Sequence, residues 1–286
     1  MENVSFIGTG VMGASIVKHL LKAGHPVTVY TRTKEKAEDL LQEGAKWAAS
    51  VEEAVVGADL IFSMVGMPTD VEEIYFGEKG ILAEGTPGQI VIDMTTSSPA
   101  LAIKIDKEAT AKGMFSLDAP VSGGDVGAKN GTLSVMCGGE ENVFSRVEPV
   151  FALFGGQVIL QGPAGSGQHT KMSNQLAIAT NMIGVCEALV YAEKAGLNPE
   201  RVLESITPGA AGSWSLSNLG PRMLADNFQP GFYTKHFVKD LKIALDEASM
   251  MELKLPGLEL AIHLYEDLIA KGYGDKGTQV LFKHYK

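Results

Sequence analysis

Short apolar runs alternate with amphipathic segments through the first half of the chain. The segments Met12–Ala23 and Lys34–Gln42 have the spacing of helices with one buried face. Continuous apolar strands separated by helices indicate a parallel sheet that is covered on both faces. The runs expected as strands are Val4–Ile7, Val27–Tyr30, Leu60–Val65 and Ile90–Asp93, with Phe115–Asp118, Thr132–Met136 and Gln157–Leu160 extending the same sheet.

The pattern changes at the Gly/Pro-rich stretch Gly162–Gly167. From there helical spacing continues almost to the C-terminus, broken by turn clusters at Gly196–Pro199 and Gln229–Gly231. We therefore predict two domains, residues 1–162 built on the sheet and residues 163–286 built of helices. A helix expected over about Gln168–Ala195 is apolar on more than one face, as in an interdomain spine or a subunit interface, and we expect a homodimer or homotetramer.

Composition then excludes several classes of protein. The net charge of −10 argues against a nucleic-acid-binding face. Cys137 and Cys186 lie far apart without metal-ligand spacing, so we expect neither a metal site nor a disulfide. The chain enters a strand pattern too early for a secretory leader. The apolar stretch Leu176–Ala192 is interrupted by Asn181 and Glu187, as in a buried helix rather than a membrane span. We expect a cytoplasmic protein with no membrane partner.

A glycine motif follows the first strand and opens the first helix. It consists of Gly8, Thr9, Gly10, Val11, Met12 and Gly13. The glycines allow a tight turn and close approach of the backbone, and the helix N-terminus attracts a pyrophosphate. A strand before the motif, a helix after it and a second strand at Val27–Tyr30 indicate a dinucleotide site. The alternative is a glycine turn with a structural role only.

The residues after the second strand bear on the choice of cofactor. NAD enzymes usually carry an Asp or Glu there, which binds the ribose hydroxyls. This chain has Thr31, Arg32 and Thr33 instead, and the Arg32 guanidinium can pair with a 2′-phosphate. We therefore expect NADP to be favoured and NAD to be possible. The alternative for Arg32 is a solvated surface charge.

Three further segments carry candidate chemistry. Asp93–Pro99 ends a strand at the carboxyl edge, where open α/β sheets bind ligands. Asp118–Gly124 is a strand followed by a Ser-Gly-Gly turn, whose N–H groups can hold a carboxylate. Gly165–Asn174 opens the long helix and places Lys171 and Asn174 on one helix face. A lysine can carry the hydroxyl proton of an alcohol while a hydride moves; a simple surface lysine is the alternative.

These motifs, in this order, resemble those of the β-hydroxyacid dehydrogenase family, which includes 3-hydroxyisobutyrate dehydrogenase, tartronate semialdehyde reductase and the glyoxylate/succinic semialdehyde reductases. The resemblance covers essentially the whole chain. It implies an α/β Rossmann-type N-terminal domain, an all-α C-terminal domain and a site in the cleft between them. It also implies hydride transfer between NAD(P) and a small 3-hydroxy acid or semialdehyde.

The resemblance further assigns roles to individual positions. It makes Lys171 the catalytic residue, and Ser122, Gly123, Gly124 and Asn174 the binders of a small carboxylate substrate. Gln175, where some members have a second Asn, is expected to contact substrate as well. With the motifs above, the expected cofactor-binding residues are Gly8, Thr9, Gly10, Val11, Met12, Gly13, Thr31, Arg32, Thr33, Met64, Val65, Thr96, Lys239 and Asp240.

Two other functions share the architecture that the resemblance implies. An imine-reductase-like enzyme is disfavoured, since those proteins generally lack the lysine that stands here at Lys171. A non-catalytic nucleotide-sensing protein is disfavoured because Lys171, Asn174, Ser122 and Lys239 are all present.

Five residues remain outside these assignments or have open roles. His169 is a second candidate acid, but it falls off the helix face of the lysine. The sequence leaves open whether Trp214 and the pair Phe232–Tyr233 line the pocket or only pack. Asp118 is expected to have a structural role at a strand end.

Overall fold

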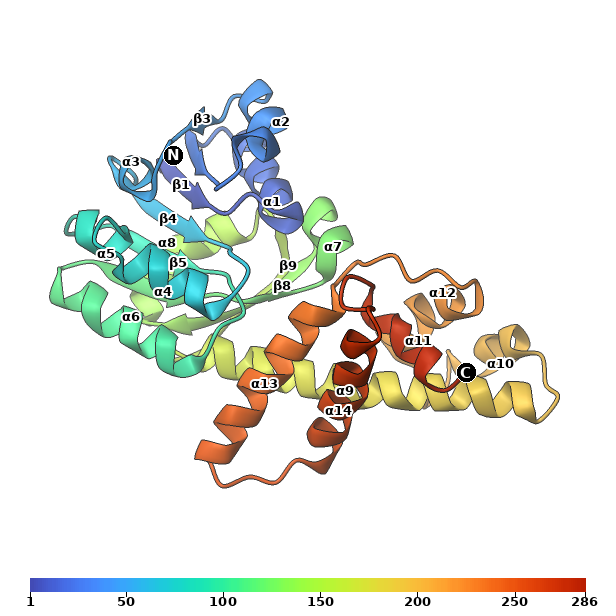
Figure 1. Cartoon of the computed structure of the whole chain (residues 1–286). Coiled ribbons are helices and arrows are strands. Elements are labelled where there is room, and N and C mark those ends of the chain that lie inside the picture. The colour runs from blue at the N-terminus through green and yellow to red at the C-terminus, as the bar shows by residue number, and fades with distance from the viewer. The chain divides into compact units, whose positions relative to one another are not determined.

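The computed structural model describes residues 1–286 and divides into two compact units, Met1–Lys171 and Met172–Lys286 (Figure 1). The division falls inside helix α9 (Ser166–Lys194), whereas the sequence places the boundary after residue 162. Each unit is described by itself below.

The first unit is built on one nine-stranded sheet, with the order β3-β2-β1-β4-β5-β6-β8-β7 and with β9 paired to β8. The strands from β3 to β6 are parallel, while β8 runs antiparallel to both β6 and β7. The strands are β1 (Val4–Ile7), β2 (Val27–Tyr30), β3 (Lys46–Trp47), β4 (Leu60–Ser63), β5 (Ile90–Asp93), β6 (Phe115–Asp118), β7 (Val121–Ser122), β8 (Leu133–Gly139) and β9 (Gly155–Gly162).

The expected parallel sheet is confirmed from β3 to β6, whereas β8 runs antiparallel to β6 and β7. Only residues Gly123–Thr132 separate β7 from β8, and a parallel crossover needs about a dozen residues or more. The chain therefore reverses, and β7 pairs Val121 with Val135 in antiparallel register. The remaining strands confirm an α/β fold dominated by parallel pairing.

Apolar side chains pack on both faces of this sheet. Successive residues of a strand point to opposite sides, so each strand contributes to both clusters. Phe6 and Phe62 belong to the hydrophobic cluster on one face, and their rings stack with centroids 5.9 Å apart. Their neighbours Ile7 and Ile61 belong to the cluster on the other face. The helices are α1 (Val11–Lys22), η1 (Lys34–Ala37), α2 (Glu38–Gln42), α3 (Val51–Val55), α4 (Pro68–Phe76), α5 (Ile81–Glu84), α6 (Pro99–Ala111), α7 (Gly124–Asn130) and α8 (Glu141–Phe151).

The second unit is helical, as the sequence predicts. Beside the rest of α9 it contains α10 (Pro199–Ile206), α11 (Trp214–Asn218), α12 (Gly220–Leu224), α13 (Thr234–Met250), α14 (Pro256–Ala270) and η2 (Thr278–His284). Its core includes Met182, Phe237, Leu241 and Tyr265. α9 is the one helix that is long and apolar enough to span a membrane, a property that core helices of soluble proteins share.

Each unit holds one free cysteine inside its core. Cys137 lies in the cluster that covers one face of the sheet, and Cys186 lies in the core of the helical unit. Burial raises the pKa of both thiols far above the ordinary value.

Candidate active site

The glycine motif forms the connection between β1 and α1. Gly8 has φ +104°, and a Cβ there would overlap the carbonyl of Met64, while a Cβ at Gly13 would overlap the carbonyl of Gly8. Around Gly10, by contrast, a Cβ would meet no atom within 4 Å. α1 has neither a side-chain cap nor an acidic residue in its first turn, and the Thr9 hydroxyl is buried without a hydrogen-bond partner. A tight, open loop with uncapped N–H groups fits a pyrophosphate.

An acidic residue from the segment after β4 lies beside the arginine that is expected to bind near the ribose. Thr31, Arg32 and Thr33 follow β2, and Arg32 Nη1 lies 3.2 Å from Asp70 Oδ1 in the first turn of α4. The other carboxylate oxygen of Asp70 accepts the Met67 N–H at 2.9 Å. Since β2 and β4 flank β1, this ion pair joins the two segments on either side of the glycine motif.

The loop after β5 rests on a buried carboxylate. Asp93 Oδ1 accepts hydrogen bonds from the Thr95 N–H and the Ser63 hydroxyl, both at 3.0 Å. Thr95 Oγ1 in turn accepts the Val65 N–H at 3.0 Å, which ties the loop to the segment after β4. Burial raises the pKa of Asp93 to about 6 against these hydrogen bonds. The half-buried Thr96 is carried by the loop that these contacts hold.

A second buried carboxylate holds the start of α9. Asp118, at the end of β6, accepts the N–H groups of Gly165 and Gln168 at 2.7 and 2.8 Å. Burial raises its pKa, and the N–H donors oppose that rise. A carboxylate at a helix N-terminus satisfies N–H groups that have no partner within the helix. A Cβ at Gly167 would overlap the Met136 carbonyl, so glycine allows the helix to approach the sheet this closely.

Lys171 lies one turn into α9 and is 7% exposed. Its Nζ donates to the carbonyl of Val121 at 2.8 Å. Val121 precedes Ser122, Gly123 and Gly124, the turn predicted to hold a carboxylate. The structure therefore brings the predicted catalytic lysine to the strand that leads into the predicted carboxylate turn.

This turn has a backbone that favours glycine. Gly123 has φ +130° and Gly124 has φ +64°, a region that side chains with a Cβ rarely adopt. Gly123 is exposed, and a Cβ at Gly124 would meet no atom within 4 Å. The turn is open to an approaching group.

The predicted residues of the second unit form a chain of polar contacts. Asn174 Nδ2 donates to Gln175 Oε1 at 2.8 Å, and Gln175 Nε2 donates to Asp240 Oδ2 at 2.6 Å. Lys239 Nζ lies 2.8 Å from Asp240 Oδ1. Asp240 and Gln175 are buried. The structure thus joins four residues that the sequence singled out on α9 and α13.

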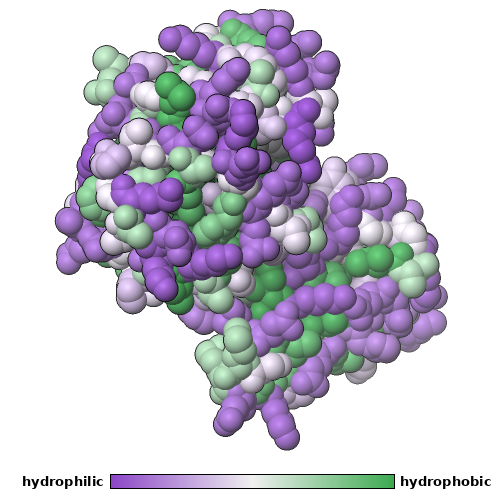
Figure 2. All heavy atoms as spheres, turned by 60° about the vertical axis from the view of Figure 1, so that its left-hand side comes forward, coloured by the Kyte–Doolittle hydropathy of each residue, from purple (hydrophilic) through white to green (hydrophobic).

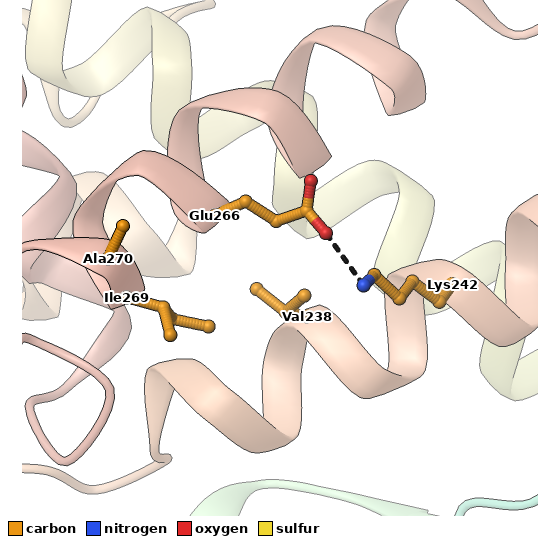
Figure 3. Close-up of a pocket in the computed structure, with 5 residues that line it drawn as sticks. All are labelled: Val238, Lys242, Glu266, Ile269 and Ala270. Carbon is orange, nitrogen blue, oxygen red and sulfur yellow. Dashed lines mark ion pairs between the residues drawn. The ribbon is translucent and has the colours of Figure 1, made fainter.

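Other candidates lie apart from these contacts. His169 is exposed while Lys171, two residues later, is buried, which fits their different helix faces. Trp214, Phe232 and Tyr233 are exposed. A pocket between α13 and α14 is lined by Val238, Lys242, Glu266, Ile269 and Ala270, with the Lys242–Glu266 ion pair at its edge (Figure 3); it contains none of the predicted site residues. No three His, Cys, Asp or Glu side chains meet as a metal site requires.

Sequence reasoning missed two contributors to this region. Asp70 pairs with Arg32 across 38 positions of the chain, and nothing in its own segment indicates this. Gln168 is fully buried and precedes Lys171 by one helical turn. Its spacing from Lys171 is the one signal that could have identified it, because residues three apart share a helix face.

Comparisons with known protein families match nearly the whole chain. Residues 3–162 match the family described as the NAD binding domain of 6-phosphogluconate dehydrogenase. Residues 165–285 match the family described as "NAD-binding of NADP-dependent 3-hydroxyisobutyrate dehydrogenase".

Individual proteins are similar over most of their length. An uncharacterised oxidoreductase of Bacillus subtilis is 59% identical over 99% of this chain and 98% of its own. A probable mitochondrial 3-hydroxyisobutyrate dehydrogenase-like protein of Arabidopsis thaliana is 50% identical over 97% of this chain and 83% of its own. The 2-hydroxy-3-oxopropionate reductase of Escherichia coli is 39% identical over 94% of this chain and 93% of its own. Among solved structures, 3-hydroxyisobutyrate dehydrogenase of Mycobacterium tuberculosis with L-serine has a TM-score of 0.90 at 31% identity, covering 99% of this chain and 98% of its own.

Proposed function

The chain belongs to the β-hydroxyacid dehydrogenase family and is an NAD(P)-dependent oxidoreductase, and on that premise we propose that Lys171 carries the proton of its reaction. The substrate is a small 3-hydroxy acid or the corresponding semialdehyde. One observation carries the proposal: the buried Lys171 Nζ lies 2.8 Å from the carbonyl of Val121, directly before the Ser122 turn.

The proposed chemistry needs one proton carrier. The nicotinamide, when bound, accepts or supplies the hydride. In oxidation the Lys171 amine takes the proton from the substrate hydroxyl as the carbonyl forms; in reduction the Lys171 ammonium returns a proton to the developing alkoxide. The hydrogen bond to the Val121 carbonyl holds the Lys171 Nζ in one orientation before substrate binds.

We assign the substrate carboxylate to the Ser122–Gly124 turn, with Asn174 and Gln175 as further contacts. The support is that Gly123 is exposed and that a Cβ at Gly124 would meet no atom within 4 Å, so an anion can approach the backbone there. N–H groups in such a turn form a concave site for an oxyanion. The Gln175–Asp240 hydrogen bond and the Lys239–Asp240 ion pair support a role for this cluster beside substrate or cofactor.

The proposed cofactor preference is for NADP, with NAD as a weaker alternative. Arg32 supports it as a cation directly after β2, where residues 31–33 include no carboxylate. Its ion pair with Asp70 offsets part of that charge. We therefore infer that the preference for NADP over NAD is smaller than the preference that an unpaired arginine would give.

The protein is also proposed to act as a homodimer or homotetramer in the cytoplasm. Large apolar side chains are exposed in the helical unit, at Tyr191, Met250, Met251, Leu253 and Leu260. Hydrophobic atoms gather on the visible face of that unit, at the lower right of Figure 2. Light scattering tests the assembly, and a mass of 30.4 kDa, that of one chain, would rule it out.

The test of the proposed reaction is Lys171→Met, assayed with NADP and NAD over a panel of small hydroxy acids and semialdehydes. The chemical step should fall by about 10²- to 10⁴-fold, the usual contribution of a general acid–base, while the affinity for the cofactor stays unchanged. Lys194→Met, at the exposed far end of the same helix, is the matched control and should retain parental turnover. Turnover of Lys171→Met within tenfold of the parent would remove the lysine from the mechanism.

A further inference from the structure

A fully buried glutamine joins the loop after β5 to the first turn of α9. The side chain of Gln168 is 0% exposed. Its Oε1 accepts the Ser97 N–H at 3.0 Å, and its Nε2 donates to the Thr95 carbonyl at 2.7 Å. We propose that Gln168 is a positioning residue that fixes Lys171 relative to the Thr95–Ser97 loop. This inference rests on the proposed role of Lys171.

The helix side of the link is rigid. Gln168 and Lys171 are three positions apart, so their side chains leave the same face of α9. The backbone N–H of Gln168 is held by Asp118, and Lys171 Nζ is held by the Val121 carbonyl. A small rotation or shift of this first turn would therefore move Nζ.

The loop side is equally constrained. Thr95 is bonded through its N–H to Asp93 and through its hydroxyl to the Val65 N–H. Thr96, one of the residues expected to bind the cofactor, is the next residue. Gln168 makes two hydrogen bonds that run from this loop to α9, and it thereby helps to hold the cofactor loop and the proton carrier in a fixed relation.

A positioning role predicts loss of rate and not only loss of stability. Gln168→Met has a similar volume but can neither accept from Ser97 nor donate to Thr95. A displacement of about 1 Å can cost a reaction about 100-fold, so we expect kcat to fall by about 10- to 100-fold. Hydrogen–deuterium exchange should rise in the Thr95–Ser98 loop and in the first turn of α9, which gives a readout independent of turnover.

Gln168→Glu gives the sharper test, because one half of the link then titrates. Protonated, the introduced carboxyl can still donate to the Thr95 carbonyl; ionised, it only accepts, and two oxygens face each other. The charged groups around it are Asp93 at the end of β5, Asp118 at the end of β6 and Lys171 on α9 itself. Since the parent has these three groups too, a fall in kcat with rising pH that is absent from the parent reports the introduced carboxyl.

The chain offers a matched control at the other end of strand β5. Gln89, directly before β5, is buried and has the same kind of contacts: Oε1 accepts the Thr86 N–H, while Nε2 donates to the carbonyls of Val55 and Ala58. Gln89→Met and Gln89→Glu should lower thermal stability as the Gln168 variants do. Their kcat and its pH profile should match the parent at temperatures where they are folded.

The outcomes separate the two proposals. If Gln168→Met is folded and its kcat lies within twofold of the parent, or if the Gln89 variants lose as much kcat, the positioning role is overturned. If Gln168→Glu follows the parent's pH profile, it is overturned as well. Lys171→Met is measured alongside: turnover retained there overturns the proposed function, whereas an inactive Lys171→Met beside a fully active Gln168→Met overturns the positioning role alone.

Discussion

Arg32 and Asp70 face each other from the two segments that flank the glycine motif, with Nη1 and Oδ1 3.2 Å apart. The arginine side chain is 78% exposed and the aspartate 19% exposed, and pairs this exposed contribute little to stability. The pair therefore changes the local charge around Arg32 more than it changes the free energy of unfolding. A carboxylate beside Arg32 weakens the attraction of this arginine for a 2′-phosphate.

The first prediction concerns the arginine. Arg32→Ala should reduce the preference for NADP over NAD by about tenfold or more, because a charge-assisted hydrogen bond contributes about 1.5 to 3 kcal/mol and 1.4 kcal/mol is tenfold in affinity. The affinities for both cofactors, measured by calorimetry, check this. An unchanged ratio of the two dissociation constants would show that Arg32 points away from the 2′-position.

The second prediction concerns its partner. Asp70→Asn keeps an acceptor for the Met67 N–H but removes the charge beside Arg32. The affinity for NADP should rise by about three- to tenfold, the effect of about 0.7 to 1.4 kcal/mol, while the affinity for NAD stays the same. Glu73→Gln removes an exposed charge from the same helix and should change neither. Weaker NADP binding in Asp70→Asn would mean that Asp70 organises Arg32 instead of competing for it.

The third prediction is the pH dependence of stability from Asp93. Burial raises its pKa from 3.8 to about 6, so the folded state binds this proton more tightly than the unfolded state. The stabilising contribution is complete below pH 3.8 and is lost as the pH rises through about 6. Asp93→Asn should therefore be more stable than the parent at pH 8, by up to about 3 kcal/mol for roughly two pKa units. Its advantage should vanish towards pH 4.

Urea unfolding at several pH values measures this difference. Asn can still accept from Thr95 and Ser63 at one oxygen, so the substitution tests the charge. A difference in unfolding free energy that does not vary between pH 4 and 8 would contradict the assigned cause.

The fourth prediction separates substrate binding from backbone strain. Gly124→Val should raise KM for the hydroxy acid sharply, because a side chain would enter the turn assigned to its carboxylate. Gly196, after α9, offers a matched position: its φ is +76° against +64° at Gly124, and a Cβ meets no atom within 4 Å at either. Gly196→Val should carry similar strain without the change in KM. Equal KM changes in the two variants would exclude the carboxylate turn.

The sequence predicts the parts of this fold that local patterns determine. Continuous apolar runs predict β1, β2 and β5 to the residue, since buried parallel strands are apolar on both faces. The reversal at β7 is missed because a two-residue strand carries too little pattern, and its direction depends on the length of the connection that follows.

The candidate site divides in the same way. Gly8, Gly13 and Lys171 stand in motifs that are contiguous in the chain, so their spacing alone predicts their place. Gln168 binds partners 71 and 73 positions away, and Asp70 binds one 38 positions away. Such pairings are set by the order of strands in the sheet, which no local spacing contains.

The two buried thiols allow the unfolding of each unit to be measured separately. Cys137 and Cys186 lie in the cores of different units and have no disulfide, and a thiol reacts only as an accessible thiolate. Modification by a thiol reagent under native conditions must therefore wait for local or global unfolding of the unit that holds the cysteine. With Cys137→Ser and Cys186→Ser as single-thiol variants, the labelling rate of each remaining thiol measures the opening free energy of one unit at a time. Equal rates would mean that the sheet and the helices unfold as one cooperative body, and unequal rates that they do not.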